Sequence, residues 1–164
     1  AAFAHAGLGV TVIGIAATAW GVEAIATVKP GDQVMIGRYS LTLEKVFNRK
    51  ESSYSEDVAQ FTIREGTREI GPIETMRRVH VGREMPTTEA GIVTLGLGQV
   101  YVSSNEFSDG GKVSLRAYWK PLVTFIWLGG LIMAFGGALS LADRRARIGV
   151  AVKRVAAKIV GQAA

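Results

Sequence analysis

The sequence predicts a membrane protein in which two transmembrane α-helices flank an all-β extracytoplasmic domain, an antiparallel sandwich or a small barrel, and a basic amphipathic helix follows. Three features predict this arrangement: two long apolar runs, a polar stretch between them rich in β-forming residues, and a cluster of Lys and Arg after the second run. The expected segments are a helix over 1–22, the β domain over 23–119, a helix over 120–142 and a tail over 143–164.

The first apolar run, AAFAHAGLGVTVIGIAATAW, contains one ionisable side chain, His5. At about 1.5 Å per residue, the run is long enough to cross roughly 30 Å of hydrocarbon. Trp20 lies near its end, where aromatic residues often anchor a helix at the membrane interface. The alternative is a buried core helix of a soluble protein. The second apolar run has the same character, and this favours the membrane.

The second apolar run extends from Pro121 to Ala142 and contains no charged residue. Tyr118, Trp119 and Lys120 precede it as an interfacial belt. Small residues at a spacing of four let helices approach closely in lipid. The second apolar run has two such sets, namely Gly130, Ala134 and Ala138, and Gly136 and Ser140. We therefore expect packing against further helices that this chain does not contain.

The polar stretch between the runs alternates apolar and polar residues as β-strands do. The alternating segments are Gln33 to Phe47, Asp57 to Glu65, Gly91 to Ser104, and Lys112 to Trp119. Turn-forming residues separate them, at Pro30-Gly31-Asp32, Asn48-Arg49-Lys50, Glu65-Gly66, Gly71-Pro72 and Asp109-Gly110-Gly111. Short strands with regular turn signals predict an antiparallel sandwich or a small barrel.

The residues after Ala142 predict the orientation in the membrane. Six Lys or Arg follow this position, namely Arg144, Arg145, Arg147, Lys153, Arg154 and Lys158. Positive residues near a transmembrane end favour the cytoplasmic side, whereas long domains cross largely regardless of charge. The tail is therefore predicted to be cytoplasmic and the β domain to lie on the opposite side of the membrane, which is the periplasm if the source is a Gram-negative bacterium. Apolar residues at helical spacing in the tail predict a basic amphipathic helix on the membrane surface, and the alternative is a solvated tail.

Composition excludes several kinds of site. The chain has no cysteine, so a disulfide scaffold, a thiolate metal site and a Cys nucleophile are excluded. Its basic residues form no patch interleaved with aromatic residues, so nucleic acid is not an expected partner. Gly96-Leu97-Gly98 lacks the third glycine of a dinucleotide fingerprint, and no zinc-type spacing is present. The chain does not begin with Met, and we expect it to be part of a longer protein.

His5 is the main candidate site residue, because an ionisable group inside a membrane span is costly and usually functional. Imidazole can ligate haem iron or another metal, carry a proton, or donate a hydrogen bond to another helix. Gly9, Val12 and Ala16 share its face at helical spacing, and a flat macrocycle could lie against these small or modest side chains. A bis-histidine haem would need a second ligand from another helix. The residues alone leave a ligand, a proton relay and a structural hydrogen bond open.

His80 is a weaker candidate, in the segment RRVHVGRE beside Arg77, Arg78 and Arg83. It is expected to be a solvated strand or loop histidine. The arginines are expected to form an ordinary charged surface, with contact to haem propionates or an acidic partner as the alternative.

Four blocks of the sequence resemble the C-terminal portion of the CcmF/NrfE family of cytochrome c-type biogenesis haem lyase subunits. They are AHAGLGVTVIGIA in the first helix, RRVHVGREMPTTEAGI and VYV in the β domain, and RAYWKPLVTFIWLGGLIMAFGGALSLADRR at the second helix. The last block is long and specific, because it includes the Tyr-Trp-Lys-Pro lead and the Asp-Arg-Arg stop. The resemblance covers nearly the whole chain.

The resemblance implies a multi-pass inner-membrane protein that receives haem from the chaperone CcmE and attaches it to apocytochrome c. CcmH, and CcmI where present, would deliver the apocytochrome. The family also holds a haem b between two transmembrane histidines, and His5 matches the second of them. The tryptophan-rich haem-handling motif and the other histidines of the family have no counterpart here. Enzymatic activity is therefore expected of the full-length protein and not of this fragment.

A second hypothesis is a non-enzymatic, membrane-anchored periplasmic scaffold that docks partner proteins. In this case His5 would make a hydrogen bond between packed helices, and Asn or Gln would serve as well at this position. A piece of a transporter is a third possibility, although His5 is the one residue that could suggest a substrate pathway.

Overall fold

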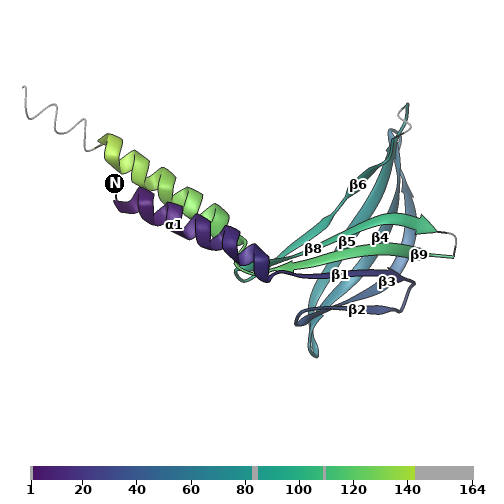
Figure 1. The fold of residues 1–164 in the computed structure, drawn as a ribbon. Coiled ribbons are helices and arrows are strands. Elements are labelled where there is room, and N and C mark those ends of the chain that lie inside the picture. The colour runs from purple at the N-terminus through teal and green to yellow at the C-terminus, as the bar shows by residue number, and fades with distance from the viewer. Residues whose placement is uncertain (1, 83–84, 109, 143–164) are drawn as a thin grey trace, which may run out of the picture. The chain divides into compact units, whose positions relative to one another are not determined.

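A computed structural model describes residues 2–82, 85–108 and 110–142 of the chain (Figure 1). These residues form two compact units. The helix unit comprises 2–15 and 125–142, and the sandwich unit comprises 16–124. Each unit is described separately below.

The sandwich unit consists of two antiparallel sheets. In the described residues, a four-stranded sheet has the order β1-β9-β8-β7, and a five-stranded sheet has the order β2-β3-β4-β5-β6. The strands of the first sheet are β1 (Val22–Val28), β7 (Gly91–Leu95), β8 (Gly98–Ser108) and β9 (Lys112–Lys120). Those of the second are β2 (Gln33–Ile36), β3 (Tyr39–Lys50), β4 (Tyr54–Glu65), β5 (Arg68–His80) and β6 (Thr87–Glu89). The predicted β domain is confirmed, and it is a sandwich and not a barrel.

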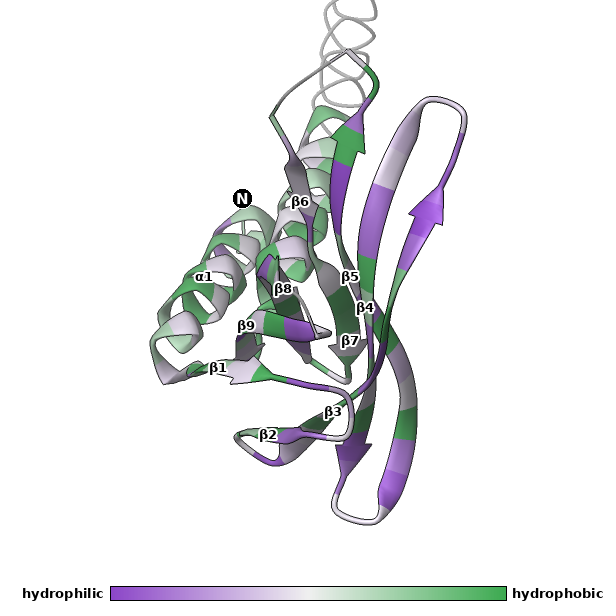
Figure 2. Ribbon diagram, turned by 90° about the vertical axis from the view of Figure 1, so that its right-hand side faces the viewer, coloured by the Kyte–Doolittle hydropathy of each residue, from purple (hydrophilic) through white to green (hydrophobic). Residues whose placement is uncertain are grey.

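Alternate residues of the strands fill the space between the sheets, as the period of two requires. The hydropathy colours of Figure 2 show green segments interrupted by purple along the long strands. One sheet contributes Val28, Val100, Val102, Val113, Leu115 and Ala117 to the core, and the other contributes Ile36, Leu41, Leu43, Phe61, Ile63 and Ile73. All of these residues are buried, so the sandwich has its own hydrophobic core.

Two of the predicted strands are each divided in the structure by a tight turn at a glycine. The segment Gln33 to Phe47 turns at Gly37, which has a φ of 58°, and the segment Gly91 to Ser104 turns at Gly96, which has a φ of 63°. This left-handed backbone is accessible to glycine at little cost. Alternation alone did not reveal these turns, because apolar residues continue on both sides of each glycine.

Two of the predicted turns lie inside strands. Asn48-Arg49-Lys50 forms the end of β3, and the chain reverses over the residues that follow. Gly71-Pro72 lies within β5, at a point where the β4–β5 register shifts by one residue. Proline has no backbone N–H to donate to the neighbouring strand, and a bulge is one of the places where a sheet tolerates it. The strand therefore continues through Pro72. The prediction of a turn at Gly71-Pro72 was therefore wrong, and it concealed β5.

The helix unit contains most of α1 (Ala2–Ala17) and a second helix within Thr124–Ala142. A short 3₁₀ turn, η1 (Thr18–Trp20), continues α1. Ala2–Trp20 and Thr124–Ala142 are long and apolar enough to cross a membrane, by length and composition. The predicted belt residues Tyr118, Trp119 and Lys120 belong to β9. The predicted basic amphipathic helix over 143–164 lies outside the described residues.

Glycines bring α1 and the second helix into close contact. Gly7 and Gly14 of α1 and Gly129 and Gly136 of the second helix are buried. A Cβ added at Gly7 would lie 2.7 Å from the carbonyl oxygen of Gly129, so a larger residue would push the backbones apart. The spacing of seven within each helix fits left-handed packing. Gly136 was among the small residues predicted to lie in a helix contact, whereas Gly130 has open space in the described structure.

Candidate functional site

His5 lies near the start of α1, where its side chain borders a small hollow. The hollow has a volume of about 230 Å³ and is lined by Ala4, His5, Leu8 and Met133. Met133 comes from the second helix, so both helices of the unit contribute to it. Apart from the imidazole, the lining side chains are apolar. The sequence predicted His5 as the site residue but gave no signal for Met133.

The face of α1 that carries His5 differs from the face that packs on the second helix. Gly7 and Thr11 lie on the packed face, where the Thr11 hydroxyl donates a 3.1 Å hydrogen bond to the Gly7 carbonyl. A Cβ added at Gly9, one turn from His5, would meet nothing within 4 Å, and Val12 is 54% exposed. The helix surface beside His5 is therefore exposed, and Gly9 adds no side chain to it.

These residues fit one half of a bis-histidine haem site. They provide one imidazole, an apolar hollow and a low helix surface against which a planar macrocycle can lie. The chain's other histidine, His80, belongs to β5 in the sandwich unit. A second axial histidine would therefore have to come from outside the described helices. The same position on α1 also suits a proton relay or a hydrogen bond between packed helices.

His80 lies at the end of β5, packed against Tyr54 of β4 with ring centroids 6.1 Å apart. It is half-buried, and the arginines near it do not form a shared cationic site. Arg78 is engaged by two carboxylates, whereas the Nε of Arg77 is buried without a hydrogen-bond partner in the described structure. Arg83 lies outside the described residues.

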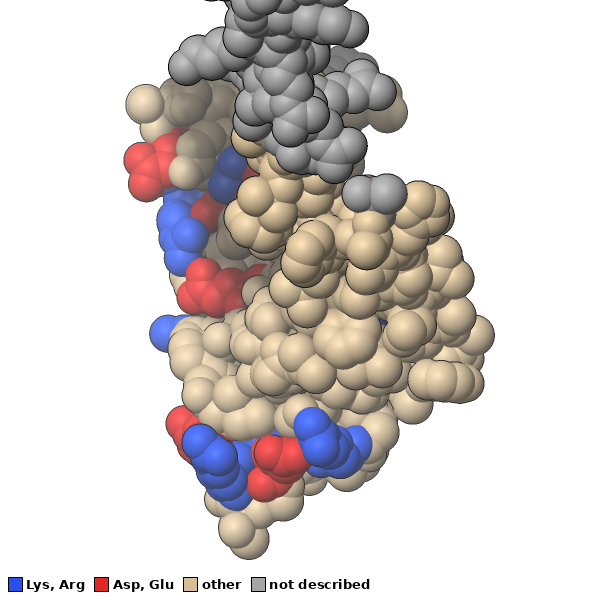
Figure 3. All heavy atoms as spheres, turned by 90° about the vertical axis from the view of Figure 1, so that its left-hand side faces the viewer, with Lys and Arg blue, Asp and Glu red and all other residues tan. Residues whose placement is uncertain are grey.

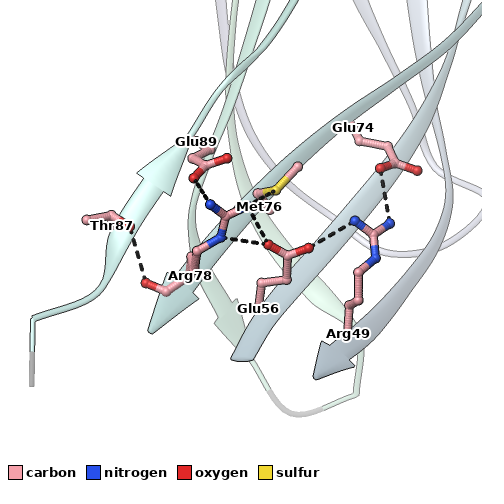
Figure 4. A network of polar contacts seen from close by, with 7 residues as sticks. All are labelled: Arg49, Glu56, Glu74, Met76, Arg78, Thr87 and Glu89. Carbon is pink, nitrogen blue, oxygen red and sulfur yellow. Dashed lines mark hydrogen bonds and ion pairs between the residues drawn. The ribbon is translucent and has the colours of Figure 1, made fainter. Parts of the chain in front are cut away.

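A network centred on Glu56 joins four strands of the five-stranded sheet (Figure 4). The Glu56 carboxylate is 1% exposed and lies 2.9 Å from Arg49 of β3 and 2.9 Å from Arg78 of β5. Arg49 also contacts Glu74, at 3.4 Å, and Arg78 contacts Glu89 of β6, at 2.7 Å. The hydrogen bond to Glu56 raises the pKa of Arg78 above its ordinary value. This network connects strands and leaves Arg78 little capacity for a ligand.

The network depends on cross-strand register, which the sequence analysis did not assign. Glu56 is paired with Arg49 in the β3–β4 register and with Arg78 in the β4–β5 register. The space-filling view shows a related feature, because charged side chains on the visible face lie in mixed groups of both signs (Figure 3). Within 2–82, 85–108 and 110–142, no group of three His, Asp or Glu side chains is placed to hold a metal ion.

Comparison with known proteins identifies the sandwich. The family model described as the CcmF C-terminal beta-sandwich matches residues 19–121. The chain is 47% identical over 150 residues to the cytochrome c-type biogenesis protein CycK of Rhizobium meliloti, an alignment that covers 90% of this chain and 22% of CycK. It is 31% identical over 163 residues to the cytochrome c-type biogenesis protein CcmF of Pseudomonas aeruginosa, covering 98% of this chain and 25% of CcmF.

A solved structure has the same fold. The cytochrome c haem lyase CcmF matches with a TM-score of 0.70 and 17% identity, over 82% of this chain and 23% of that chain. The present chain thus spans a quarter or less of the length of these relatives. The resemblance stated from the sequence is confirmed, and the chain belongs to the CcmF family of cytochrome c-type biogenesis proteins, whose C-terminal β-sandwich it carries.

Proposed function

We propose that this chain is the C-terminal part of a haem lyase subunit that helps to attach haem to apocytochrome c. The similar proteins support this proposal, because two of them are named cytochrome c-type biogenesis proteins and one is named a cytochrome c haem lyase. The chain covers a quarter or less of those relatives. We therefore assign the activity to the full-length protein and not to this chain alone.

Within the full-length protein, His5 serves as one axial ligand of a haem b. The observation that carries this proposal is the position of the one ionisable side chain of α1 on an open, low face beside an apolar hollow. Placing such a group within hydrocarbon is costly unless it has a ligand, a proton or a partner. A haem in this place supplies an electron-transfer centre whose potential depends on its axial ligands and on the local dielectric.

The residues of this chain have distinct parts in that site. The helix backbone fixes the position of the imidazole, whose nitrogen lone pair is the ligand. Leu8 and Met133 line the hollow beside the imidazole with apolar surface, and Gly9 leaves room for a flat ring. A second histidine ligand would have to come from another helix, and the open space at Gly130 and Gly137 offers a surface for such a helix.

The orientation follows from charge. Because six Lys or Arg follow Ala142, the C-terminus is cytoplasmic, and the sandwich lies in the periplasm of a Gram-negative bacterium. The protein is then a multi-pass protein of the inner membrane. On the periplasmic side the sandwich supports or docks the haem chaperone CcmE, CcmH with CcmI where present, and apocytochrome c. Reporter fusions to the C-terminus that are active only in the periplasm would contradict this orientation.

Replacement of His5 by Ala in the full-length protein is the experiment that tests the haem proposal. The b-type absorption spectrum of the purified protein should be lost or strongly altered, whereas the amount of protein in the membrane should not change. His80→Ala is the matched control, because it removes the chain's other imidazole from the sandwich and should leave the spectrum unchanged.

A normal b-type spectrum in the His5→Ala protein would contradict the proposal. His5→Gln separates it from the scaffold hypothesis, because Gln can hydrogen-bond between helices but is not a haem ligand of comparable strength. Normal cytochrome c maturation with His5→Gln, together with partner binding that does not depend on haem, would favour a non-enzymatic docking module.

A further inference from the structure

A second hollow lies within the sandwich unit, where the chain passes to and from the apolar helices. Its volume is about 570 Å³. Its walls include Trp20, Arg38, Leu97, Trp119, Pro121 and Leu122, and Arg38 is the one charged residue among those that line it. An arginine in an otherwise apolar and aromatic hollow suits a ligand that combines an anion with apolar groups.

Residues that line this hollow are close in sequence to the ends of both apolar segments. Trp20 is the last residue of the apolar segment Ala2–Trp20, and Pro121 and Leu122 directly precede Thr124–Ala142. If both segments cross a bilayer, residues at their ends lie among the lipid headgroups. Tryptophan favours this region, because its ring is apolar and its N–H is polar.

Arg38 is held in place by aromatic rings and yet remains accessible. Its guanidinium carbon lies 5.1 Å from the centre of the Tyr39 ring and 5.7 Å from that of Trp119. Glu65 approaches its Nε at 3.1 Å, and the Arg38 side chain is 63% exposed. Stacking of this kind orients the planar guanidinium without consuming its donors.

The walls of the hollow are fixed by close packing. A Cβ added at Gly98 would collide with the ring of Trp119, so glycine is needed for that ring to occupy its place. Thr124 links the segment after β9 to the β7–β8 turn, because its hydroxyl donates a 2.7 Å hydrogen bond to the Leu97 carbonyl. Its backbone N–H also donates to that carbonyl, at 3.3 Å. The hollow is thus a built feature of the sandwich unit.

The local charge favours an anion. A neighbouring hollow of about 270 Å³ shares Arg38 and Leu95 with the first and adds Arg68 and Glu65 to its lining. The two arginines outnumber the single carboxylate at this place. A guanidinium can contact two oxygens of one phosphate at once, which makes arginine a good phosphate ligand.

We propose that the Arg38 hollow binds an anionic phospholipid, with the headgroup phosphate on Arg38 and the adjoining glycerol against Trp20 and Trp119. The acyl chains would remain in the bilayer. Such a contact would set the depth of the sandwich at the membrane surface. This inference does not depend on a haem at His5.

Titration of the full-length protein with phosphatidylglycerol or phosphatidylcholine tests it, with bound lipid counted by native mass spectrometry. The wild-type protein should retain phosphatidylglycerol in preference to phosphatidylcholine. Arg38→Gln should lower the affinity for phosphatidylglycerol by about tenfold, the effect of losing one charge-assisted contact. The matched control is Arg64→Gln, which removes the same charge from an exposed pair with Glu69 outside the hollow. It should leave the affinity unchanged.

Three results would overturn the proposal. The first is equal loss of phosphatidylglycerol in the Arg38→Gln and Arg64→Gln proteins, which would indicate a general charge effect. The second is equal retention of both lipids by the wild-type protein. The third is displacement of the lipid by inorganic phosphate at millimolar concentration, which would make the hollow a site for a free anion. The side chains of Arg38 and Arg64 are 63% and 47% exposed, so neither variant is expected to prevent folding.

Discussion

The helix unit and the sandwich unit accommodate polar and apolar side chains in opposite ways. In the sandwich, apolar side chains such as Phe61 face inward, and the buried carboxylate of Glu56 is paired with two arginines. In the helices, Trp127 and Leu131 are 72% and 70% exposed, and the one ionisable residue of α1 lies on an exposed face. The sandwich therefore buries a core of large apolar side chains and pairs the buried Glu56, with the Nε of Arg77 and the Oγ of Ser104 left unpartnered in the described structure, whereas the described helices expose large apolar side chains.

This difference indicates where function resides. A unit with its own buried core can serve as a stable support and docking surface. The exposed apolar faces of the helix unit suit contact with lipid and with further helices, and His5, the proposed haem ligand, lies on one of them.

Disulfide cross-linking gives the largest expected effect, because it is nearly all-or-none. A Cβ built at Gly136 lies 2.9 Å from the Cβ of Phe3, so the helices need to separate by only about 1 Å to reach the Cβ–Cβ distance of a disulfide, whereas a Cβ built at Gly137 meets nothing within 4 Å. In a cysteine-free background, Phe3→Cys with Gly136→Cys should therefore form a disulfide on oxidation. Phe3→Cys with Gly137→Cys, the matched control, should not. Equal cross-linking of both pairs, measured by gel mobility, would disprove the helix contact.

Truncation of a core side chain should have the next largest effect. The segment 19–121, expressed without the helices, should fold by itself and unfold cooperatively in urea. Phe61 is 1% exposed, so Phe61→Ala should lower the free energy of unfolding by about 3–5 kcal/mol. Ile25 is 68% exposed, and Ile25→Ala should change it by less than about 0.5 kcal/mol. An unfolded segment 19–121 would show that the sandwich depends on the helices.

Loss of the Glu56 carboxylate should have an intermediate effect. Glu56→Gln leaves Arg49 and Arg78 without their shared buried partner, although both arginines keep some access to water and a second carboxylate. We expect the free energy of unfolding to fall by about 1–3 kcal/mol. Glu69→Gln removes a carboxylate from an exposed pair with Arg64 and should cost at most about 1 kcal/mol. An equal fall in the free energy of unfolding for Glu56→Gln and Glu69→Gln, measured in urea, would show that the buried carboxylate contributes no more than the exposed one.

The smallest expected effect concerns Glu23 of β1. A hydrogen bond from Arg116 of β9, with an Nε–oxygen distance of 2.6 Å, lowers the pKa of the Glu23 carboxyl below its ordinary value. The pair therefore adds stability above the ordinary carboxyl pKa, and this contribution is lost as the pH falls through the lowered pKa. The difference in urea midpoint between the wild-type and Glu23→Gln proteins should be small at neutral pH and should vanish in acid. A difference that grows in acid would contradict this sign.

The sequence predicted the helix unit better than the details of the sandwich, for a physical reason. His5 is conspicuous because a lone ionisable residue in an apolar run needs no tertiary information to be noticed. Arg49, Glu56 and Arg78 become a network only once the strand register is known, and β5 was concealed by the bulge at Gly71-Pro72. The hollow at Arg38 was also not predictable, because segments distant in the sequence supply its walls.

Chemical rescue is the most direct test of the claim that the imidazole of His5 ligates a haem. His5→Gly in the full-length protein removes the ligand and leaves a space that free imidazole can enter. We expect the b-type spectrum to be lost and to return when millimolar imidazole is added, with no response to added acetamide. A b-type spectrum that persists in the His5→Gly protein without imidazole would show that His5 is not a haem ligand.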